Sequence, residues 1–261
     1  MNYATDFKSI RSEVSEQEWQ ARVDLAACYR LIDQYAMSDL IYNHITARIP
    51  GTEHLLINLY GLLYKEITAS SLVKIDVEGK IVWKPDTDYG INVSGYVIHG
   101  AIHKARPDVA CVLHTHTVAG VAVSCQKQGL LPLNQWSMQF TGCLAYHDYE
   151  GIALDLDERE RLVADLGDKF VMVLRNHGML TCGRSVAEAF KLMHNLERSC
   201  RAQLAIQSAG AEIAPLSDAV AHKTAGQYAT FYDSIETNGV PDTEWAAFKR
   251  MLERTDPDFM N

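Results

Sequence analysis

The chain has 261 residues, of which 48% are hydrophobic and 22% charged, and its formal net charge is −9. These values predict a globular protein with a substantial core, and an acidic chain without a basic cluster is unsuited to nucleic acid. No apolar run approaches membrane-spanning length, the N-terminus lacks a leader pattern, and the six cysteines form no C-x-x-C pair. We therefore expect a cytoplasmic protein with neither a nucleic-acid nor a membrane partner.

The N-terminal half predicts one long helix followed by several short strands. Residues 1–15 are polar and are expected to form a flexible arm. Residues 16–37 carry apolar side chains at helical spacing, which predicts an amphipathic helix. Strands are predicted for residues 45–49, 55–59, 72–76 and 81–83, with a hairpin turn between the last two.

The rest of the chain alternates predicted helices and strands. Helices are expected at residues 97–105, 117–126, 156–166 and 186–208, and strands at 110–114, 170–174 and 179–182. Pro107 would stop the first of these helices, while Ser185 and Glu188 form a capping box at the start of the last. Residues 217–254 are mostly helical in pattern. We expect one α/β domain over residues 16–210 and a helical C-terminal extension, 211–261, packed on it.

Three histidines follow or end two predicted strands. His114 and His116 are two residues apart, so in an extended chain their side chains project to the same side. His177 follows the strand predicted for 170–174 and precedes Gly178. Three imidazoles from two strand ends can hold a zinc or iron ion and leave one coordination position open. A His-x-His pair alone is equally typical of a protein surface.

Several motifs together with these histidines resemble the class II aldolase/adducin family. Segments 42–48 (YNHITAR) and 106–109 (RPDV) resemble the family, and the resemblance covers about residues 20–210. Segments 57–63 (INLYGLL) and 146–151 (YHDYEG) resemble its adducin-like branch. The resemblance implies a three-layer α/β/α fold around a mainly antiparallel sheet, assembled as a homotetramer with sites between subunits. It also implies that His114, His116 and His177 are the metal ligands.

The sequence departs from the aldolases at the position of their proton-shuttling glutamate. Alignment on His99 places Gly95 there, so the general base of the aldol reaction is missing from its usual place. We expect a replacement proton carrier, for which the candidates are His147, Tyr96, Glu66 and a metal-bound hydroxide.

The segments that bind phosphate in the aldolases are also altered. Tyr42, Tyr60 and Val93 replace small residues that let backbone amides approach a phosphate group. A phosphorylated sugar is therefore disfavoured as substrate. The residues expected to contact substrate are Asn43, Tyr60, Gly61 and Ser94.

Carbon–carbon bond cleavage is a reaction that a site without the glutamate can still catalyse. A metal that chelates a hydroxy- or keto-acid is an electron sink, so cleavage or decarboxylation can begin without removal of a C–H proton. We expect a metal-dependent lyase that uses zinc, or alternatively Fe(II) or Mn, on a small unphosphorylated acid or carbonyl compound. Two alternatives are a non-haem iron oxygenase and a non-catalytic adducin-like binding protein.

Two further histidines, His99 and His103, are spaced i and i+4 on a predicted helix. This spacing can bind zinc, but no motif supports a second metal site, and structural hydrogen bonding is favoured.

Overall fold

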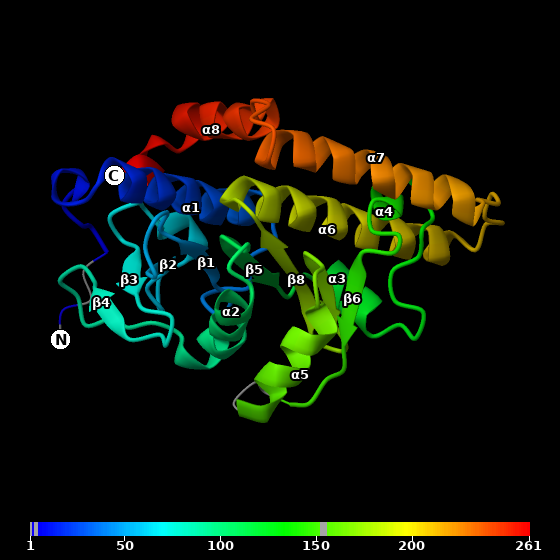
Figure 1. Ribbon diagram of the computed structural model, residues 1–261, viewed down its shortest axis with the longest axis horizontal. Helices are drawn as coiled ribbons and strands as arrows, with labels where there is room; N and C mark the ends of the chain where they lie inside the picture. The colour runs from blue at the N-terminus through cyan, green and yellow to red at the C-terminus, as the bar shows by residue number, and fades with distance from the viewer. Residues whose placement is uncertain (1, 3–4, 152–155) are drawn as a thin grey trace.

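The computed structural model describes residues 2, 5–151 and 156–261. In this part of the chain eight strands form a single sheet in the order β4-β3-β2-β1-β5-β8-β7-β6 (Figure 1). Neighbouring strands are antiparallel except for β6 and β7, which are parallel. The mainly antiparallel sheet of the expected fold class is confirmed.

The strands are short. Their bounds are β1 (Ile45–Arg48), β2 (Leu55–Ile57), β3 (Val73–Ile75), β4 (Ile81–Trp83), β5 (Cys111–Thr115), β6 (Leu144–His147), β7 (Val171–Leu174) and β8 (Gly178–Gly183). The helices are α1 (Glu16–Gln34), α2 (Val93–Ala105), α3 (Val118–Ser124), α4 (Gln135–Met138), α5 (Leu156–Leu166), α6 (Val186–Ala209), α7 (Asp218–Glu236) and α8 (Thr243–Thr255). Three short 3₁₀ turns are η1 (Arg11–Glu13), η2 (Tyr64–Glu66) and η3 (Pro257–Met260).

Helices cover both faces of the sheet, which gives the three layers. Along β7, Val171 and Val173 join the larger core with α1 and α6, while Met172 and Leu174 join a second core with α2 and α5. This alternation follows from the two-residue repeat of a strand, since successive side chains point to opposite faces. Helices α7 and α8 lie along the outside of α6 and α1 (Figure 1).

The predicted helices and strands are found, with bounds that differ by a few residues. Helix α2 begins at Val93, earlier than expected, and α8 and α7 divide the predicted C-terminal helical region. Helix α4 and strand β6 were not predicted. Both have four residues, and β6 is an edge strand with alternate side chains only partly buried. Segments of this length carry too little periodicity to be recognised.

Described residues near both ends of the chain pack against the domain. In the N-terminal arm Phe7 and Ile10 are buried, and the side-chain amide of Asn261 donates a hydrogen bond to the carbonyl oxygen of Phe7. Phe259 is fully buried, and its carbonyl accepts from the backbone N–H of Ala69. Among the described residues, no helix combines the length and the apolarity needed to cross a membrane.

Candidate metal centre

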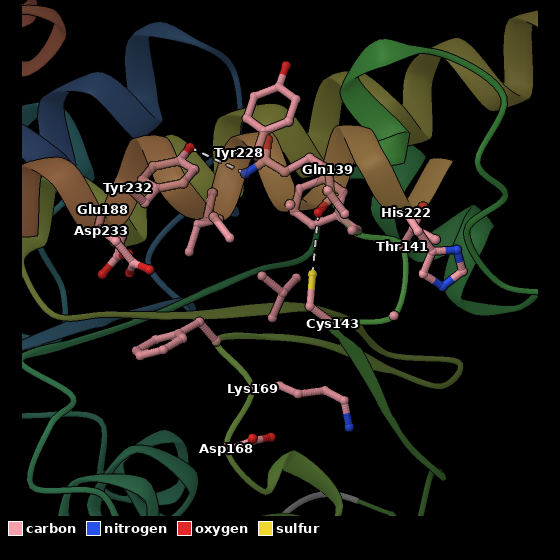
Figure 2. A pocket seen from close by; sticks show the side chains of 18 of the residues that line it. Gln139, Thr141, Cys143, Asp168, Lys169, Glu188, His222, Tyr228, Tyr232 and Asp233 are labelled. Carbon is pink, nitrogen blue, oxygen red and sulfur yellow. Dashed lines mark hydrogen bonds between the residues drawn. The ribbon is translucent and has the colours of Figure 1, made fainter. Parts of the chain in front are cut away.

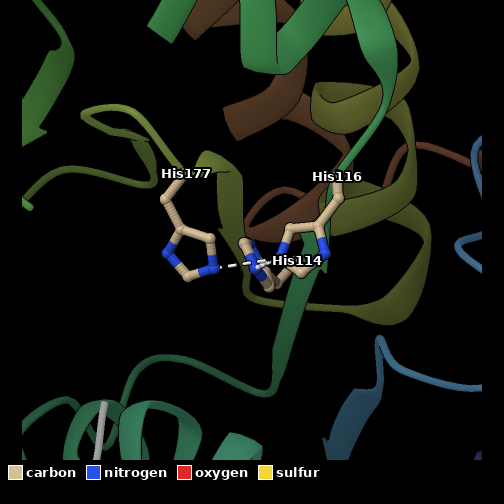
Figure 3. A group of neighbouring side chains, drawn as sticks. All are labelled: His114, His116 and His177. Atoms are coloured by element: carbon tan, nitrogen blue, oxygen red, sulfur yellow. Dashed lines mark hydrogen bonds between the residues drawn. The ribbon is translucent and has the colours of Figure 1, made fainter. Parts of the chain in front are cut away.

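The three histidines of the predicted metal site lie together at one end of β5 and β8. His114 is in β5, His116 follows that strand, and His177 is in the turn between β7 and β8. The Nε2 atoms of His114 and His116 are 2.8 Å apart, and those of His116 and His177 are 2.9 Å apart (Figure 3). In the described residues this is the only group of three or more histidine, cysteine or acidic side chains close enough to share a metal ion.

The segment Asn176-His177-Gly178 has the backbone that this arrangement requires. Asn176 has a φ of 57°, in the left-handed region that asparagine tolerates better than most residues. A Cβ atom at Gly178 would lie 2.4 Å from the carbonyl oxygen of Thr115 and 3.3 Å from the His114 ring. Glycine therefore lets β8 approach β5 closely where the ligand side chains emerge.

Hydrogen bonds to the far ring nitrogens fix how two of the imidazoles are protonated. The Nδ1 atom of His114 is 2.8 Å from the carbonyl oxygen of Met179, and the Nδ1 atom of His116 is 3.0 Å from a carboxylate oxygen of Asp39. Both partners only accept, so each Nδ1 carries the proton and each neutral ring presents an Nε2 lone pair to the other. Facing lone pairs repel one another unless a cation lies between them. This donor set therefore fits a divalent metal ion.

The environment keeps the rings of His114 and His177 neutral. Burial, with a smaller effect of the neighbouring imidazoles of His177 and His116, lowers the pKa of His114 well below its usual value. Burial and then His116 lower the pKa of His177 to about 4. Because a metal competes with protons for the same nitrogen, low pKa values leave the ligands available at neutral pH.

The predicted substrate residues occupy different environments. Asn43 is buried, and neither its amide nitrogen nor its amide oxygen has a hydrogen-bond partner among the described residues. Tyr60 is partly exposed, and Tyr42 is 53% exposed. The ring of Tyr89 lies 2.4 Å from the position of a Cβ atom at Gly61, whose φ is 121°. Tyr89 therefore covers the backbone where the aldolases were expected to leave room for phosphate. The side chain of Ser94 lies outside the described residues.

The three side chains among the candidate proton carriers lie apart from one another. His147 is buried at the end of β6, and its Nδ1 atom is 2.7 Å from a carboxylate oxygen of Asp165. The Tyr96 hydroxyl donates to the carbonyl of Val77, and Glu66 accepts from the backbone N–H of its own 3₁₀ turn. In the described part of the chain no hydrogen bond or ring contact links Tyr96 or Glu66 to the three histidines. Their catalytic roles stay predictions.

Two residues near the histidines had not been predicted. Asp39 follows α1 and contacts His116, and the ring of Tyr149 lies 6.2 Å from that of His177. No local sequence pattern distinguishes Asp39, because its contact with His116 arises only when the end of α1 packs next to the end of β5 in the folded chain. Tyr149 lies in the segment 146–151 that carried the family resemblance, which was the available signal.

The structural role expected for His99 and His103 is confirmed. The hydroxyl oxygen of Thr46 is 2.9 Å from Nδ1 of His99 and 2.8 Å from Nε2 of His103. The His99 ring also packs on His44 at a centroid distance of 4.0 Å. These histidines join α2 to β1.

Comparison with known proteins agrees with this architecture. The family described as Class II Aldolase and Adducin N-terminal domain matches residues 23–204. An aldolase class 2 protein of Pseudomonas aeruginosa is 49% identical over 96% of this chain and 95% of its own length. Rat α-adducin is 49% identical over 72% of this chain, which corresponds to 26% of the adducin.

Solved structures give the same result. An aldolase II superfamily protein from Pseudomonas syringae has a TM-score of 0.91 and 53% identity, covering 97% of this chain and 100% of that one. An L-fuculose 1-phosphate aldolase from Glaciozyma antarctica has a TM-score of 0.79 at 24% identity, covering 98% and 97%, and shares the fold. The chain thus belongs to the class II aldolase/adducin family.

Proposed function

We propose that this protein is a metal-dependent lyase that cleaves a carbon–carbon bond in a small, unphosphorylated hydroxy- or keto-acid or carbonyl compound. The observation that supports this most directly is the pair of Nε2 lone pairs on His114 and His116, each fixed by a hydrogen bond at Nδ1. Zinc is the favoured ion, and Fe(II) or Mn would fit the same nitrogen ligands.

The surrounding residues have separate tasks in this proposal. A divalent ion held by the three histidines would supply a Lewis acid for the oxygen atoms of the substrate. Asp39 orients His116, and the buried amide of Asn43 offers an unused donor and acceptor to a substrate carboxylate or hydroxyl group. Tyr149, whose ring lies near that of His177, could deliver a proton from its hydroxyl group to the leaving fragment.

His147 is the favoured replacement for the missing glutamate among the three side-chain candidates. Its carboxylate partner, Asp165, would stabilise the ring when it takes up a proton. Tyr96 is a poor base because burial raises its pKa. Glu66 is engaged in capping its own turn.

The substrate is proposed to lack a phosphate group because Tyr89 covers Gly61. Phosphate binding at a glycine depends on open access to backbone N–H groups. An aromatic ring at this position removes that access.

The active unit is proposed to be a cytoplasmic homotetramer. Exposed apolar side chains lie next to the metal centre: Leu40 follows Asp39, Val118 is two residues beyond His116, and Tyr149 packs near His177. Val118 is 87% exposed and Leu40 is 67% exposed. A second copy that covers these side chains would also close the site.

The test combines metal analysis with matched substrates. Untagged protein purified without oxygen should contain about one zinc per chain, and a His114→Ala, His116→Ala variant should contain none. The reconstituted protein should release a carbonyl product from unphosphorylated acids or from L-fuculose, and not from L-fuculose 1-phosphate. Faster cleavage of the phosphorylated sugar would contradict the proposal, and bound iron with oxygen consumption would favour the oxygenase.

A non-catalytic binding protein is the second candidate. Rat α-adducin and the bacterial aldolase class 2 protein are both 49% identical to this chain, over 72% and 96% of it, and the match covers 26% of the adducin. Absence of metal after reconstitution with zinc, iron and manganese would favour this reading over the lyase.

A further inference from the structure

A second cavity lies away from the metal centre, between α7 and the edge of the sheet. Its volume is about 570 Å³, and it is bordered by the connection from α4 to β6, the start of β7, the first turns of α6 and one side of α7 (Figure 2). None of the three ligand histidines lines it. Cavities of this size are typical of small-molecule sites.

Part of the α7 wall of the cavity consists of small residues. Ala225, Gly226 and Ala229 line it together with the larger Tyr228 and Tyr232. A Cβ atom at Gly226 would meet no other atom within 4 Å. A glycine inside a helix costs about 0.5–1 kcal/mol relative to alanine, and packing does not require one here.

The opposite wall is apolar and could hold a hydrocarbon or aromatic group. It is formed by Phe170 and Val171 at the start of β7, with Leu192 of α6 beside them. At one end Arg184 is neutralised by ion pairs with Glu188 and Asp233, at 2.6 and 2.7 Å. That end therefore offers no free cation.

The other part of the cavity contains polar groups without partners. Among the described residues, no hydrogen bond or ion pair is found for the Lys169 ammonium group, and the hydroxyl oxygen of Thr141 is buried without a hydrogen-bond partner. Figure 2 shows Lys169, Thr141 and His222 away from the Glu188 and Asp233 end. Asp168 is exposed on the rim and forms no ion pair with Lys169.

We propose that this cavity binds a small carboxylate with an apolar or aromatic body. The carboxylate would accept a hydrogen bond from the Lys169 ammonium group, and the body would lie against Phe170 and Val171. Burial of the apolar surface of the ligand would contribute affinity, and the charged hydrogen bond would make the site selective for a carboxylate. This site is separate from the metal centre and does not depend on the proposed lyase activity.

The test uses 3-phenylpropionate and its uncharged amide, 3-phenylpropanamide, which have nearly the same size. Isothermal titration of the full chain should show saturable binding of the acid, at least about tenfold tighter than that of the amide. Lys169→Met should remove this preference. Gly226→Leu should abolish binding of both compounds by filling the cavity, while Lys223→Met, which removes a charge from α7 outside the cavity, should change nothing.

Three results would overturn the proposal: no saturable binding of the acid, equal binding of acid and amide, or unchanged binding in Gly226→Leu. Circular dichroism of each variant checks that it is folded. If Lys169→Met does not fold, the acid and amide comparison on the wild-type chain together with Gly226→Leu still decides the question.

Discussion

At the scale of single residues, Asp39 has the most specific role in the proposed metal centre. Its carboxylate fixes the proton of His116 on Nδ1, and loss of such a partner commonly weakens metal binding 10–100-fold. We expect Asp39→Ala to lower zinc affinity by about this factor, and Asp39→Asn to lower it less because the amide oxygen can still accept. A chelator competition titration measures both. Glu53→Gln, at a highly exposed side chain, is the control, and equal affinities in all four proteins would refute the role.

Gly178 permits the approach of β8 to β5. In Gly178→Ala the new methyl group would lie 2.4 Å from the carbonyl oxygen of Thr115, so one strand must shift. We expect a loss of about 1–3 kcal/mol in the free energy of unfolding, together with weaker metal binding. Urea denaturation measures the first quantity. Gly90→Ala is the matched control, because a Cβ atom there meets nothing within 4 Å; similar losses in both variants would contradict the explanation.

The ligand histidines could be predicted from the sequence, but the residues that support them could not. His114, His116 and His177 could be recognised because spacing along strands and a family motif both pointed to them. The carbonyl of Met179 and the carboxylate of Asp39 could not, since they reach the rings only through packing between distant segments. Tyr89 was missed for the same reason. Its contact with Gly61 joins two loops that no periodic pattern describes.

At the scale of elements, the expected strands were found where apolar residues form a clear run, and β6 shows where this fails. Its side chains alternate between partly buried and buried at the sheet edge. Its parallel pairing with β7 requires a crossover, which α5 supplies. The helix was predicted from its own periodicity, whereas the edge strand has too few residues to be distinguished from a loop.

Helix α6 contains a histidine that should make stability depend on pH. Burial, with smaller effects of Arg198 and Arg201, lowers the pKa of His194 to about 4, and its ring packs against Tyr35 of the α1 C-terminus and Phe190. In the unfolded chain the His194 ring takes up a proton near pH 6.5, whereas in the folded chain it does so only near pH 4. The free energy of unfolding is therefore highest above pH 6.5 and decreases as the pH falls towards 4.

We expect His194→Phe to reduce this loss. Between pH 7 and pH 5 the variant should lose about 1 kcal/mol less than the wild type, after allowance for the partial exposure of the ring. Denaturant unfolding at the two pH values measures the difference. The same pH dependence in both proteins would show that His194 is not responsible. His222→Phe, at an exposed histidine of α7, is the control.

At the scale of the whole molecule, the C-terminal segment closes the fold. Arg30 of α1 makes ion pairs with Asp256 and Asp258, at 2.7 and 3.2 Å, and Phe259 is fully buried beside them. We expect Phe259→Ala to reduce the free energy of unfolding by about 3–5 kcal/mol, because it leaves a cavity in the core. Met260→Ala, at a neighbouring residue that is 38% exposed, should change stability little. Equal effects in calorimetry would contradict this account.

The exposed apolar side chains around the metal centre connect the shape of one chain to its proposed assembly. Val118 lies two residues beyond His116, and burying its side chain against a second copy would exclude water from the site. If the homotetramer forms there, Val118→Glu should place an uncompensated charge in each interface and shift the protein towards smaller species in sedimentation equilibrium. Val240→Glu, at an exposed valine between α7 and α8, should leave the assembly unchanged. If both variants, or neither of them, dissociate the oligomer, the subunit interface does not lie at Val118. Loss of activity together with disassembly, but with metal retained, would show that the site is completed by the neighbouring chain.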